Sequence, residues 1–367
     1  MDCPYIGILV DGLVYSGFKK GYTYFECLPY YEEAGRNNHF IPCYFRLKDI
    51  NPGNSTITAY VLGEGNNYDL QVIPKPTIIH NRGLFFTKMA RSKIASLQKE
   101  GIILFNSWNR YEKLQVHELL TKKSSLRSYL PETVKASKDH MEEMMSKHDE
   151  LIIKPSSGSL GNSIIKVAKV SNENWEIIFQ KNKSLVKESF ANIKWPEKLI
   201  TIVSNPRYII QQRIPLATYQ ASPFDLRVSV QRNGIGEWQV SGIVGKVAQK
   251  GMYVTNLAKG GTSRPLSVLL QDLPHLNLED VSTTIKNFSI EIAEQLGEHI
   301  PYLADIGLDI GITNEGFPMF IECNARDLRI TFRNANMMDE WKATHITPLN
   351  YAIFLMKNNQ KHKEGEQ

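Results

Sequence analysis

The segment that most constrains this fold is a hairpin near the end of the chain. Strands are predicted over residues 302–313 and 318–324, joined by a turn at residues 314–316. Asp309 and Glu322 lie six or seven residues from the centre of the turn, so antiparallel pairing sets them opposite each other. Asn324 shares the face of Glu322, because side chains alternate along a strand. Three oxygen ligands at one spot suit a hard cation such as Mg²⁺.

An acidic, solvated sheet face is the alternative interpretation of this hairpin. Phe320 and Ile321 argue against it, because they indicate a buried strand in which unpaired carboxylates would be costly. Asp305 lies on the same face but too far along the strand to join the set.

The beginning of the chain predicts a small α/β unit. The length of 367 residues suggests two or three folding units of roughly 150 residues each. Strands within residues 5–12, 74–80 and 101–105, separated by helical stretches, place the first unit at about residues 1–105. Its first turn has no G-x-G-x-x-G sequence, so a dinucleotide-binding Rossmann unit is not indicated.

A helix and then a β-rich region follow. Leucines every three to four positions predict a helix from Asn109 to Leu130. Five strands are predicted, over residues 151–154, 164–170, 208–214, 225–231 and 238–244. Asn233 and Gly234 indicate a hairpin turn between the last two. The predicted fold class is therefore α/β with a large mixed (α+β) portion.

A long amphipathic helix precedes the final hairpin. Asn277 is predicted to cap it, and its apolar positions recur at steps of three and four residues. These positions are Val281, Ile285, Phe288, Ile292 and Leu296. The stretch after Asn358 is polar and is expected to be frayed.

Composition excludes several classes of protein. Hydrophobic residues are 42% and charged residues 22%, which is ordinary for a globular protein and rules out disorder. The longest apolar runs are too short for a membrane span, and no signal peptide is recognisable, so we expect a cytoplasmic protein. The net charge of +5 comes from residues 87–127. We expect that patch to be a solvated helix face or the mouth of an anion site, and not a nucleic-acid groove.

A glycine- and serine-rich loop is the second candidate site. Lys154 ends a strand, and the loop that follows lets backbone N–H groups approach phosphate oxygens. The order is strand, loop, strand, and G-x-x-x-x-G-K-[ST] is absent, so the segment is not a P-loop. A plain turn is the alternative.

Three further segments carry weaker signals. The strand at 208–214 turns polar at Gln211 and Gln212, where the backbone is available to an adenine edge. Arg227 and Lys246 lie on a predicted hairpin, where two cations suit a polyphosphate or an acyl phosphate, although two surface charges are an equal alternative. Asn256 lies in a polar loop that either connects strands or closes over a ligand.

The order of these residues along the chain, with Lys113 before them, resembles the ATP-grasp superfamily. Within it the chain is most similar to the YheC/YheD family of spore-coat-associated proteins, through residues 80–82, 105–106, 130–133 and 256–261. The resemblance implies an N-terminal pre-ATP-grasp domain at 1–105 and an ATP-grasp domain at 106–358. The latter would comprise a lid at about 133–207 and a catalytic subdomain at about 208–358, before a polar tail at 359–367.

The resemblance also implies a role for each site residue. Lys113 and Lys154 would hold the α- and β-phosphates of ATP, and the loop at 156–161 would cover the phosphates. Asp309, Glu322 and Asn324 would ligate one or two Mg²⁺ ions, with Mn²⁺ as an alternative. The loop residues that would contact the phosphates are Ser156, Ser157, Gly158, Ser159 and Gly161. The hinge that contacts adenine would be Gln211, Gln212, Arg213 and Ile214. The catalytic residues would be Arg227, Lys246 and Asn256.

The sequence departs from the superfamily at three places. Gln212 stands where many relatives have Glu, and Lys246 stands where Arg is commoner. After Asn324 the usual Pro-Gly character is missing. Arg326 and Arg329, in that segment, are candidates to bind a substrate carboxylate, with ordinary salt bridges as the alternative.

The activity implied is a Mg-ATP-dependent carboxylate–amine ligase that works through an acyl phosphate and releases ADP and phosphate. Its partners would be a small-molecule or peptide carboxylate, an amine acceptor and spore coat proteins, with neither nucleic acid nor membrane. The alternatives are a non-catalytic, ATP-binding protein of the spore coat and an ATP-dependent phosphotransferase.

Overall fold

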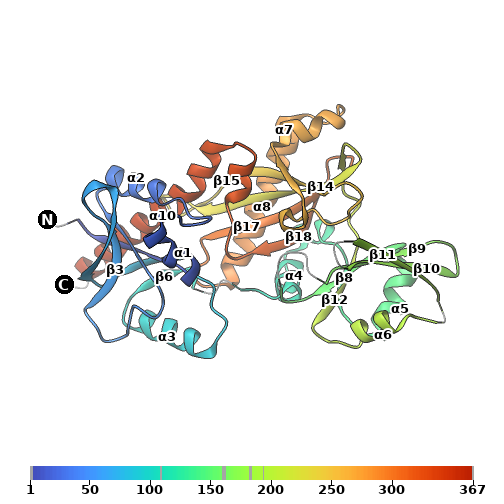
Figure 1. The fold of residues 1–367 in the computed structure, drawn as a ribbon, viewed down its shortest axis with the longest axis horizontal. Helices are drawn as coiled ribbons and strands as arrows, with labels where there is room; N and C mark the ends of the chain where they lie inside the picture. Colours follow the sequence, from blue (N-terminus) through green and yellow to red (C-terminus); the bar gives the residue numbers. More distant parts are fainter. Residues whose placement is uncertain (1–2, 108–109, 159–162, 182–183, 193, 366–367) are drawn as a thin grey trace.

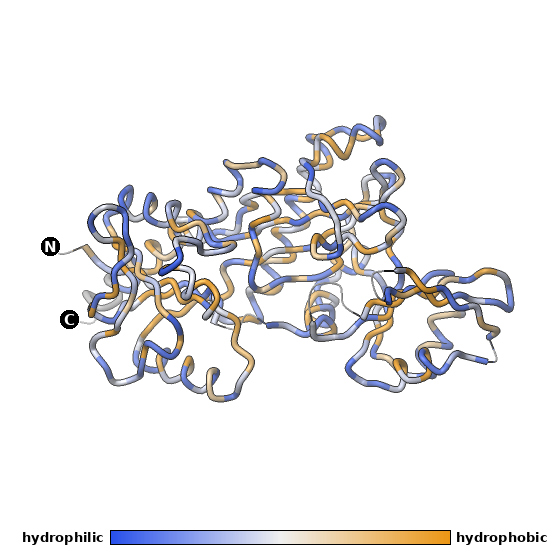
Figure 2. The backbone as a smooth tube through the Cα atoms, in the orientation of Figure 1, coloured by the Kyte–Doolittle hydropathy of each residue, from blue (hydrophilic) through white to orange (hydrophobic). Residues whose placement is uncertain are grey.

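Three β-sheets follow one another along an elongated molecule (Figure 1). The computed structural model describes residues 3–107, 110–158, 163–181, 184–192 and 194–365. Hydrophobic residues gather along the strands of the sheets, and the connecting loops are mostly hydrophilic (Figure 2).

The first sheet has the strand order β4-β3-β2-β1-β5-β6. Its centre is parallel, because β1 pairs in parallel with both β2 and β5, and β5 with β6. Its strands are β1 (Tyr5–Leu9), β2 (Ile41–Phe45), β3 (Thr56–Leu62), β4 (Tyr68–Pro74), β5 (Ile78–Asn81) and β6 (Ile103–Phe105). The helices of this part are α1 (Gly12–Gly17), α2 (Leu28–Asn38) and α3 (Lys88–Lys99). The small α/β unit is therefore present, with more strands than the sequence predicts.

The second sheet, at the other end of the molecule, is antiparallel with the order β11-β10-β9-β8-β12-β7. Helices α5 and α6 lie beside it (Figure 1). Its strands are β7 (Thr133–Lys135), β8 (Glu150–Pro155), β9 (Ile165–Lys169), β10 (Asn174–Lys181), β11 (Ser184–Ala191) and β12 (Tyr208–Gln212). The helices of this stretch are α4 (Lys113–Thr121), α5 (Lys138–Lys147) and α6 (Glu197–Val203).

The third sheet lies between the other two (Figure 1) and has the order β16-β15-β14-β17-β18, with β13 beside β14. Its strands are β13 (Thr218–Tyr219), β14 (Ser222–Arg232), β15 (Trp238–Val247), β16 (Thr262–Arg264), β17 (Asp305–Ile312) and β18 (Pro318–Asn324). Its helices are α7 (Leu266–Leu269), α8 (Leu278–His299), α9 (Ile330–Asn334) and α10 (Met338–Gly365). Helix α8 begins at the predicted cap, since Asn277 accepts hydrogen bonds from the backbone N–H groups of Glu279 and Asp280. Its five predicted apolar positions are all buried in the core of this sheet.

Helix α10 belongs to two parts of the molecule. It contacts β14 and β15 of the third sheet, and it also contacts α2 and β5 of the first. Its residues Leu349, Ala352 and Ile353 are buried in the same hydrophobic cluster as Ile6 and Ile8 of β1. The core of the first sheet is therefore completed by the end of the chain.

A buried polar network joins the first and third sheets. The carboxylate of Asp305, at the start of β17, lies 3.0 Å from Nε2 of His80, 2.6 Å from Nη2 of Arg329 and 3.3 Å from Nη1 of Arg82. Burial opposes the ionisation of Asp305, but the neighbouring cations outweigh it and hold its pKa below the ordinary value. Removing one partner would leave buried charge uncompensated, so this network fixes how the two sheets meet.

Two predictions of secondary structure need correction, and a third is confirmed. The helix predicted from Asn109 to Leu130 ends at Thr121 in the structure, and Asn109 itself lies outside the described residues. A 3₁₀ segment (Ser124–Tyr129) follows the helix, and its Leu126 is buried in the same hydrophobic cluster as Leu120. Helix α10 continues to Gly365, so the stretch after Asn358 is helical and not frayed. The β14–β15 turn is confirmed as a hairpin, but the residue with the positive φ of 84° is Gly236.

No helix in the described ranges combines the length and apolar character that crossing a membrane requires.

Stability is expected to fall as the pH drops from 7 to 5. Burial lowers the pKa of His80 to about 4 and that of His345 to about 3, so both are neutral in the folded protein. In the unfolded chain a histidine binds a proton below about pH 6.5. The unfolded state therefore binds more protons in this range, and each histidine should remove roughly 2 kcal/mol from the free energy of unfolding between pH 7 and 5.

Denaturant unfolding at pH 7 and pH 5 measures this loss. The variant His345→Gln should lose less stability over that interval than the wild type. His275, which is exposed, provides the matched control His275→Gln, whose loss should equal that of the wild type. Equal losses for all three proteins would contradict the assignment.

Candidate functional site

The carboxylates of Asp309 and Glu322 stand opposite each other on β17 and β18, which confirms the predicted register of this hairpin. The register shifts after Asp309, where Ile321 is the extra residue of a β-bulge. This bulge accommodates the unequal distances of the two carboxylates from the turn. Nδ2 of Asn324 lies 3.4 Å from Oδ2 of Asp309. All three side chains line the same cavity.

Two cations neutralise Asp309. Nε of Arg227 donates to its Oδ1 at 2.8 Å, and Nζ of Lys246 lies 3.0 Å from its Oδ2. Arg227 is directly opposite Asp309 in the sheet, and Lys246 comes from the next strand. Burial alone would raise the pKa of Asp309, but the charges of Arg227 and Lys246 hold that pKa below its ordinary value. Asp309 is thus an ionised carboxylate in a buried place.

Lys246 also binds a second carboxylate. Its Nζ lies 3.1 Å from Oδ1 of Asp225, the residue paired with it across β14 and β15. The hydroxyl of Thr255 donates to the other oxygen of Asp225. Burial raises the pKa of Asp225, and the charge of Lys246 opposes that shift.

Asp327 holds the other end of Arg227, and the sequence interpretation missed it. Its Oδ1 accepts from Nη1 of Arg227 at 2.9 Å, and its Oδ2 accepts from the hydroxyl of Ser229. Its backbone carbonyl accepts from Nη2 of Arg82 at 2.8 Å. A Cβ at position 307 would lie 2.6 Å from Oδ1 of Asp327, so Gly307 is needed for this approach. Asp327 lies three residues past Asn324, and nothing in its spacing distinguishes it from a surface charge.

Lys113 and Lys154 approach the same cleft from two elements. Nζ of Lys113, at the start of α4, lies 3.3 Å from Oε2 of Glu322 and donates to the carbonyl of Gly158 at 3.0 Å. Nζ of Lys154, on β8, donates to Oε1 of Gln211 on β12 at 2.7 Å. Burial lowers the pKa of Lys154 to about 8.

The glycine- and serine-rich loop is described in part. The buried hydroxyl of Ser156 has no hydrogen-bond partner among the described residues, and the hydroxyl of Ser157 lies 3.4 Å from Glu112. Gly158 has a φ of 145°, which side chains rarely adopt, so a glycine is required there. Ser159 and Gly161 lie outside the described residues.

The predicted hinge reaches the cleft at Gln211. Gln212, Arg213 and Ile214 do not line it. The backbone N–H groups of Gln212 and Arg213 donate to the carbonyls of Glu132 and Glu150, at 2.8 and 3.0 Å. The side chain of Arg213 pairs with Glu150.

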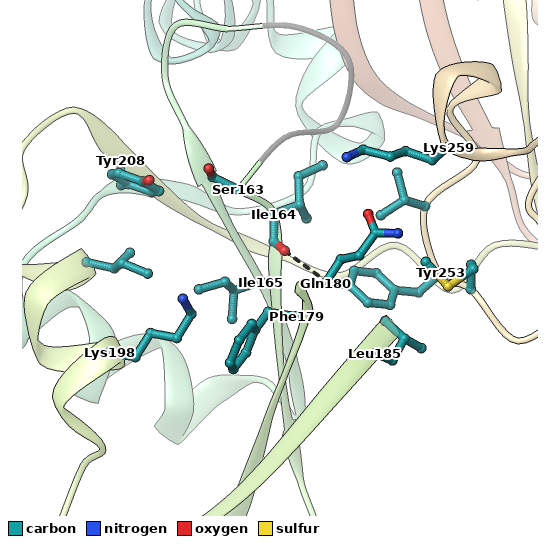
Figure 3. A pocket seen from close by; sticks show the side chains of 13 residues that line it. Ser163, Ile164, Ile165, Phe179, Gln180, Leu185, Lys198, Tyr208, Tyr253 and Lys259 are labelled. Atoms are coloured by element: carbon teal, nitrogen blue, oxygen red, sulfur yellow. Dashed lines mark hydrogen bonds between the residues drawn. The ribbon is translucent and has the colours of Figure 1, made fainter. Parts of the chain in front are cut away.

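The loop at residues 249–261 runs from β15 to β16 of the third sheet and contacts the second sheet. Asn256 lines the cleft, and its Oδ1 accepts from the N–H of Ala258 at 2.9 Å. The hydroxyl of Tyr253 lies 3.0 Å from the carbonyls of Ile164 and Ile178, on the second sheet. Figure 3 shows Tyr253 against a separate cavity of about 390 Å³, which Lys198 and Lys259 flank.

The two arginines after Asn324 have different surroundings. Arg329 is fully buried, with Nη1 2.9 Å from the hydroxyl of Tyr31 and Nη2 on Asp305. It is unable to reach a substrate, which corrects the sequence expectation for this residue. Arg326 does line the cleft, and its Nη1 donates to Oδ2 of Asp11 at 2.6 Å.

Two adjoining cavities, of about 520 and 100 Å³, connect the site residues. Both are lined by Lys113, Lys246, Asn256, Asp309 and Glu322. The described part of the chain holds no group of three or more His, Cys, Asp or Glu side chains arranged for a metal. The predicted donors that line the large cavity are the carboxylates of Asp309 and Glu322 and the amide of Asn324. A cleft between two antiparallel sheets, with lysines at one side and paired carboxylates at the other, can hold an anion and a hard cation together.

Solved structures share this architecture. The ATP-grasp ligase PsnB complexed with a minimal precursor is 15% identical, with a TM-score of 0.51 covering 94% of this chain and 100% of that chain. The VanG D-Ala:D-Ser ligase from Enterococcus faecalis is 13% identical, with a TM-score of 0.50 covering 94% of this chain and 98% of that chain. The fold is therefore the ATP-grasp fold.

The sequence comparisons are more specific. The chain is 26% identical to the endospore coat-associated protein YheD of Bacillus subtilis, over 96% of this chain and 79% of YheD. It is 24% identical to the endospore coat-associated protein YheC of the same organism, over 60% of this chain and 59% of YheC. A model of the YheC/D-like ATP-grasp family matches residues 101–355. The chain belongs to the YheC/D-like ATP-grasp family.

The variant Asp327→Ala is expected to destabilise the fold by about 3–5 kcal/mol, because it leaves Arg227 buried with one partner removed. Asp149, whose side chain is 82% exposed, provides the matched control Asp149→Ala, which should change stability by less than about 0.5 kcal/mol. Denaturant unfolding measures both. A loss for Asp327→Ala no greater than the control's would show that Arg227 does not need this carboxylate.

Proposed function

We propose that the protein is a Mg-ATP-dependent carboxylate–amine ligase that forms an amide through an acyl phosphate. The observation that carries the proposal is the meeting of Asp309 and Glu322 with Lys113, Lys154 and Arg227 in one cleft of an ATP-grasp fold. A nucleoside triphosphate needs such a combination of cations and metal ligands. PsnB and VanG, which share the fold, are both named as ligases.

In this proposal Lys113 and Lys154 bind the α- and β-phosphates of ATP, and residues 156–161 cover the phosphates. The hydroxyl of Ser156, which has no hydrogen-bond partner within the described part of the chain, and the glycine backbone at Gly158 support that use of the loop. Gln211, which lines the cleft, is the proposed adenine contact of the predicted hinge at residues 211–214.

Asp309, Glu322 and Asn324 are the proposed ligands of Mg²⁺, as one or two ions, with Mn²⁺ as an alternative. The donor set fits the ion, because carboxylate and amide oxygens are the ligands it prefers and Asp309 is held ionised. The amide of Asn324 must turn its oxygen inward, since its nitrogen now faces Asp309. The metal would supply charge neutralisation for the phosphate oxygens.

Arg227, Lys246 and Asn256 are the proposed catalytic residues. An oxygen of the substrate carboxylate attacks the γ-phosphorus, the bond to ADP breaks, and an acyl phosphate forms. The amine then attacks the acyl carbon, phosphate leaves with the bonding electrons, and a proton is lost from nitrogen. Arg227 and Lys246 are fixed cations on one sheet, so they can stabilise the transferring phosphoryl group without reorganising.

The proposal extends to organisation and setting. Residues 1–105 would form the pre-ATP-grasp domain, 133–207 the lid and 208–358 the catalytic subdomain. The carboxylate would be a small molecule or a peptide, and the protein would act in the cytoplasm and in association with the spore coat, as the names of YheD and YheC suggest.

The central test is ADP release from Mg-ATP with pooled amino acids and short peptides. The wild type should release ADP and phosphate only when the pool is present, and Glu322→Ala should lower the rate at least 100-fold, because one ligand of the metal is gone. The exposed Glu298 gives the matched control Glu298→Ala, which should keep the wild-type rate.

Other products would point to other functions. AMP, or an unchanged rate in Glu322→Ala, would refute the ligase. A stable phosphorylated product without free phosphate would indicate a phosphotransferase. Tight Mg-ATP binding without any turnover would favour a non-catalytic protein of the spore coat.

Nucleotide affinity is expected to fall as the pH rises from 7 to 9. The pKa of Lys154 is about 8 in the free protein, so this cation loses its proton within that range. Calorimetric titration with Mg²⁺ and the non-hydrolysable analogue AMPPNP should show a weakening of several-fold. Lys154→Arg keeps the charge and should flatten the dependence. A wild-type affinity that is constant over this range would exclude the role of Lys154.

A further inference from the structure

One edge of the first sheet is open. Strand β4 is the last strand in the order β4-β3-β2-β1-β5-β6, and within the described part of the chain it pairs only with β3. It has seven residues, Tyr68–Pro74, of which four in succession are exposed. An open edge presents a row of backbone N–H and C=O groups to any chain that can add a further strand.

Two hydrogen bonds show which backbone groups of β4 face this edge. The N–H of Gly63 donates to the carbonyl of Asn67 at 2.7 Å, and the N–H of Lys75 donates to the carbonyl of Ser55 at 2.9 Å. These two pairs bracket the β3–β4 ladder, whose register is regular between them. Bonded and non-bonded pairs alternate in an antiparallel ladder, so the odd-numbered residues of β4 bond to β3 and the even-numbered residues point their N–H and C=O groups outward.

The even-numbered residues at the centre of β4 are also apolar and exposed. Leu70 is 49% exposed and Val72 is 74% exposed, and their side chains share one face because side chains alternate along a strand. The only charged residue of the strand is Asp69, on the opposite face. Native edge strands are usually protected by charges, by proline or by shortness. Pro74 stands only at the end of β4, so the centre of this strand is unprotected.

The other sheet edges are protected. Strands β6, β7 and β16 have three residues each. Strand β11 has eight residues, but Lys187 and Glu188 are exposed at its centre. Strand β18 is contacted by α4, by α8 and by the 3₁₀ segment Ser124–Tyr129. Within the described ranges, β4 is therefore the long edge that lacks such protection.

A second copy of this chain fits the edge. If two β4 strands pair antiparallel about Gln71, Leu70 of each copy lies opposite Val72 of the other, and both pairs bring outward-facing N–H and C=O groups together. The two Asp69 side chains then lie four positions apart along the ladder, so they do not repel each other closely. Each Asp69 is diagonal to Lys75 of the other copy, on the same face and at about 7–8 Å, so the charges of this register are complementary.

We propose that β4 pairs with β4 of a second copy, in an antiparallel register centred on Gln71, so that the first sheet continues from one copy into the other. A two-fold axis relates the copies, because both use the same segment. The inference goes beyond the proposed function and does not depend on it.

The cleft stays open in this dimer. Asp11 and Arg82, which contact Arg326 of the cleft, follow β1 and β5. These strands are three and four places from β4 in the sheet. Figure 1 shows β3, the neighbour of β4, at the end of the molecule far from β8. Each copy therefore keeps access to its own site.

Analytical ultracentrifugation measures the assembly. Over about 1 to 200 µM protein the mass should rise from 41.8 kDa towards twice that value, because an edge-to-edge interface is small and a micromolar dissociation constant is expected. Val72→Lys sets a charge opposite Leu70 in both pairs and should raise the dissociation constant at least tenfold. The matched control is Val170→Lys, which changes a valine that is 65% exposed beyond β9 and should dimerise like the wild type.

Cysteine cross-linking tests the register. Gln71 meets Gln71 of the other copy as a non-bonded pair, with Cα atoms about 4.5 Å apart, which suits a disulfide. Gln71→Cys should therefore form a covalent dimer when its thiols are oxidised with diamide. In Asp69→Cys the two cysteines would be about 13 Å apart, so this variant should not cross-link. The wild type, treated in the same way, controls for the four native cysteines.

Each outcome decides the proposal. A monomer at every concentration would overturn it and leave the edge to an extended segment of another protein. A dimer that Val72→Lys does not weaken would place the contact on a different surface and would also overturn it. Equal cross-linking of Asp69→Cys and Gln71→Cys would exclude the register centred on Gln71. Because Val72 and Gln71 are exposed, both variants are expected to fold, and their unfolding midpoints at low concentration should match that of the wild type.

Discussion

The buried charge of Asp309 is the constraint on which the centre of this molecule depends. A carboxylate in the interior of a sheet is tolerated only if cations neutralise it, and Arg227 and Lys246 do so from two neighbouring strands. Those cations need partners in turn, which Asp327 and Asp225 provide. The registers of β14, β15 and β17 are therefore fixed by charge as well as by the apolar core. The same arrangement leaves an ionised oxygen donor facing the cleft.

A second buried network determines how the first sheet meets the third. Asp305 binds His80, Arg82 and Arg329, and Arg82 also binds the backbone of Asp327. Through that backbone contact, the loop after β5 connects to the residue that holds Arg227. Helix α10 adds apolar contacts across the same boundary. The residues at the two ends of the cleft are thus connected through buried ion pairs and apolar contacts.

The second sheet contributes fewer fixed contacts to the site. Lys154 and the loop at 156–158 face the cleft, and Tyr253 ties the loop at 249–261 to two carbonyls of that sheet. Asn256, three residues from Tyr253, lines the cleft. The second sheet is therefore connected to the third by contacts of this loop and of Lys113, whereas the first sheet meets the third through buried ion pairs.

The sequence by itself determined the local elements and the residues that carry chemistry. Alternation and turn residues were sufficient to pair Asp309 with Glu322, and helical periodicity was sufficient for α8, because both patterns depend on neighbours in the chain. Only the tertiary structure decided which charges are structural. Nothing in the sequence distinguishes Arg326 from Arg329, yet Arg326 lines the cleft whereas Arg329 is buried and pairs with Asp305. Asp327 and the role of α10 were also beyond sequence reasoning, because burial and ion pairing depend on residues that are hundreds of positions apart.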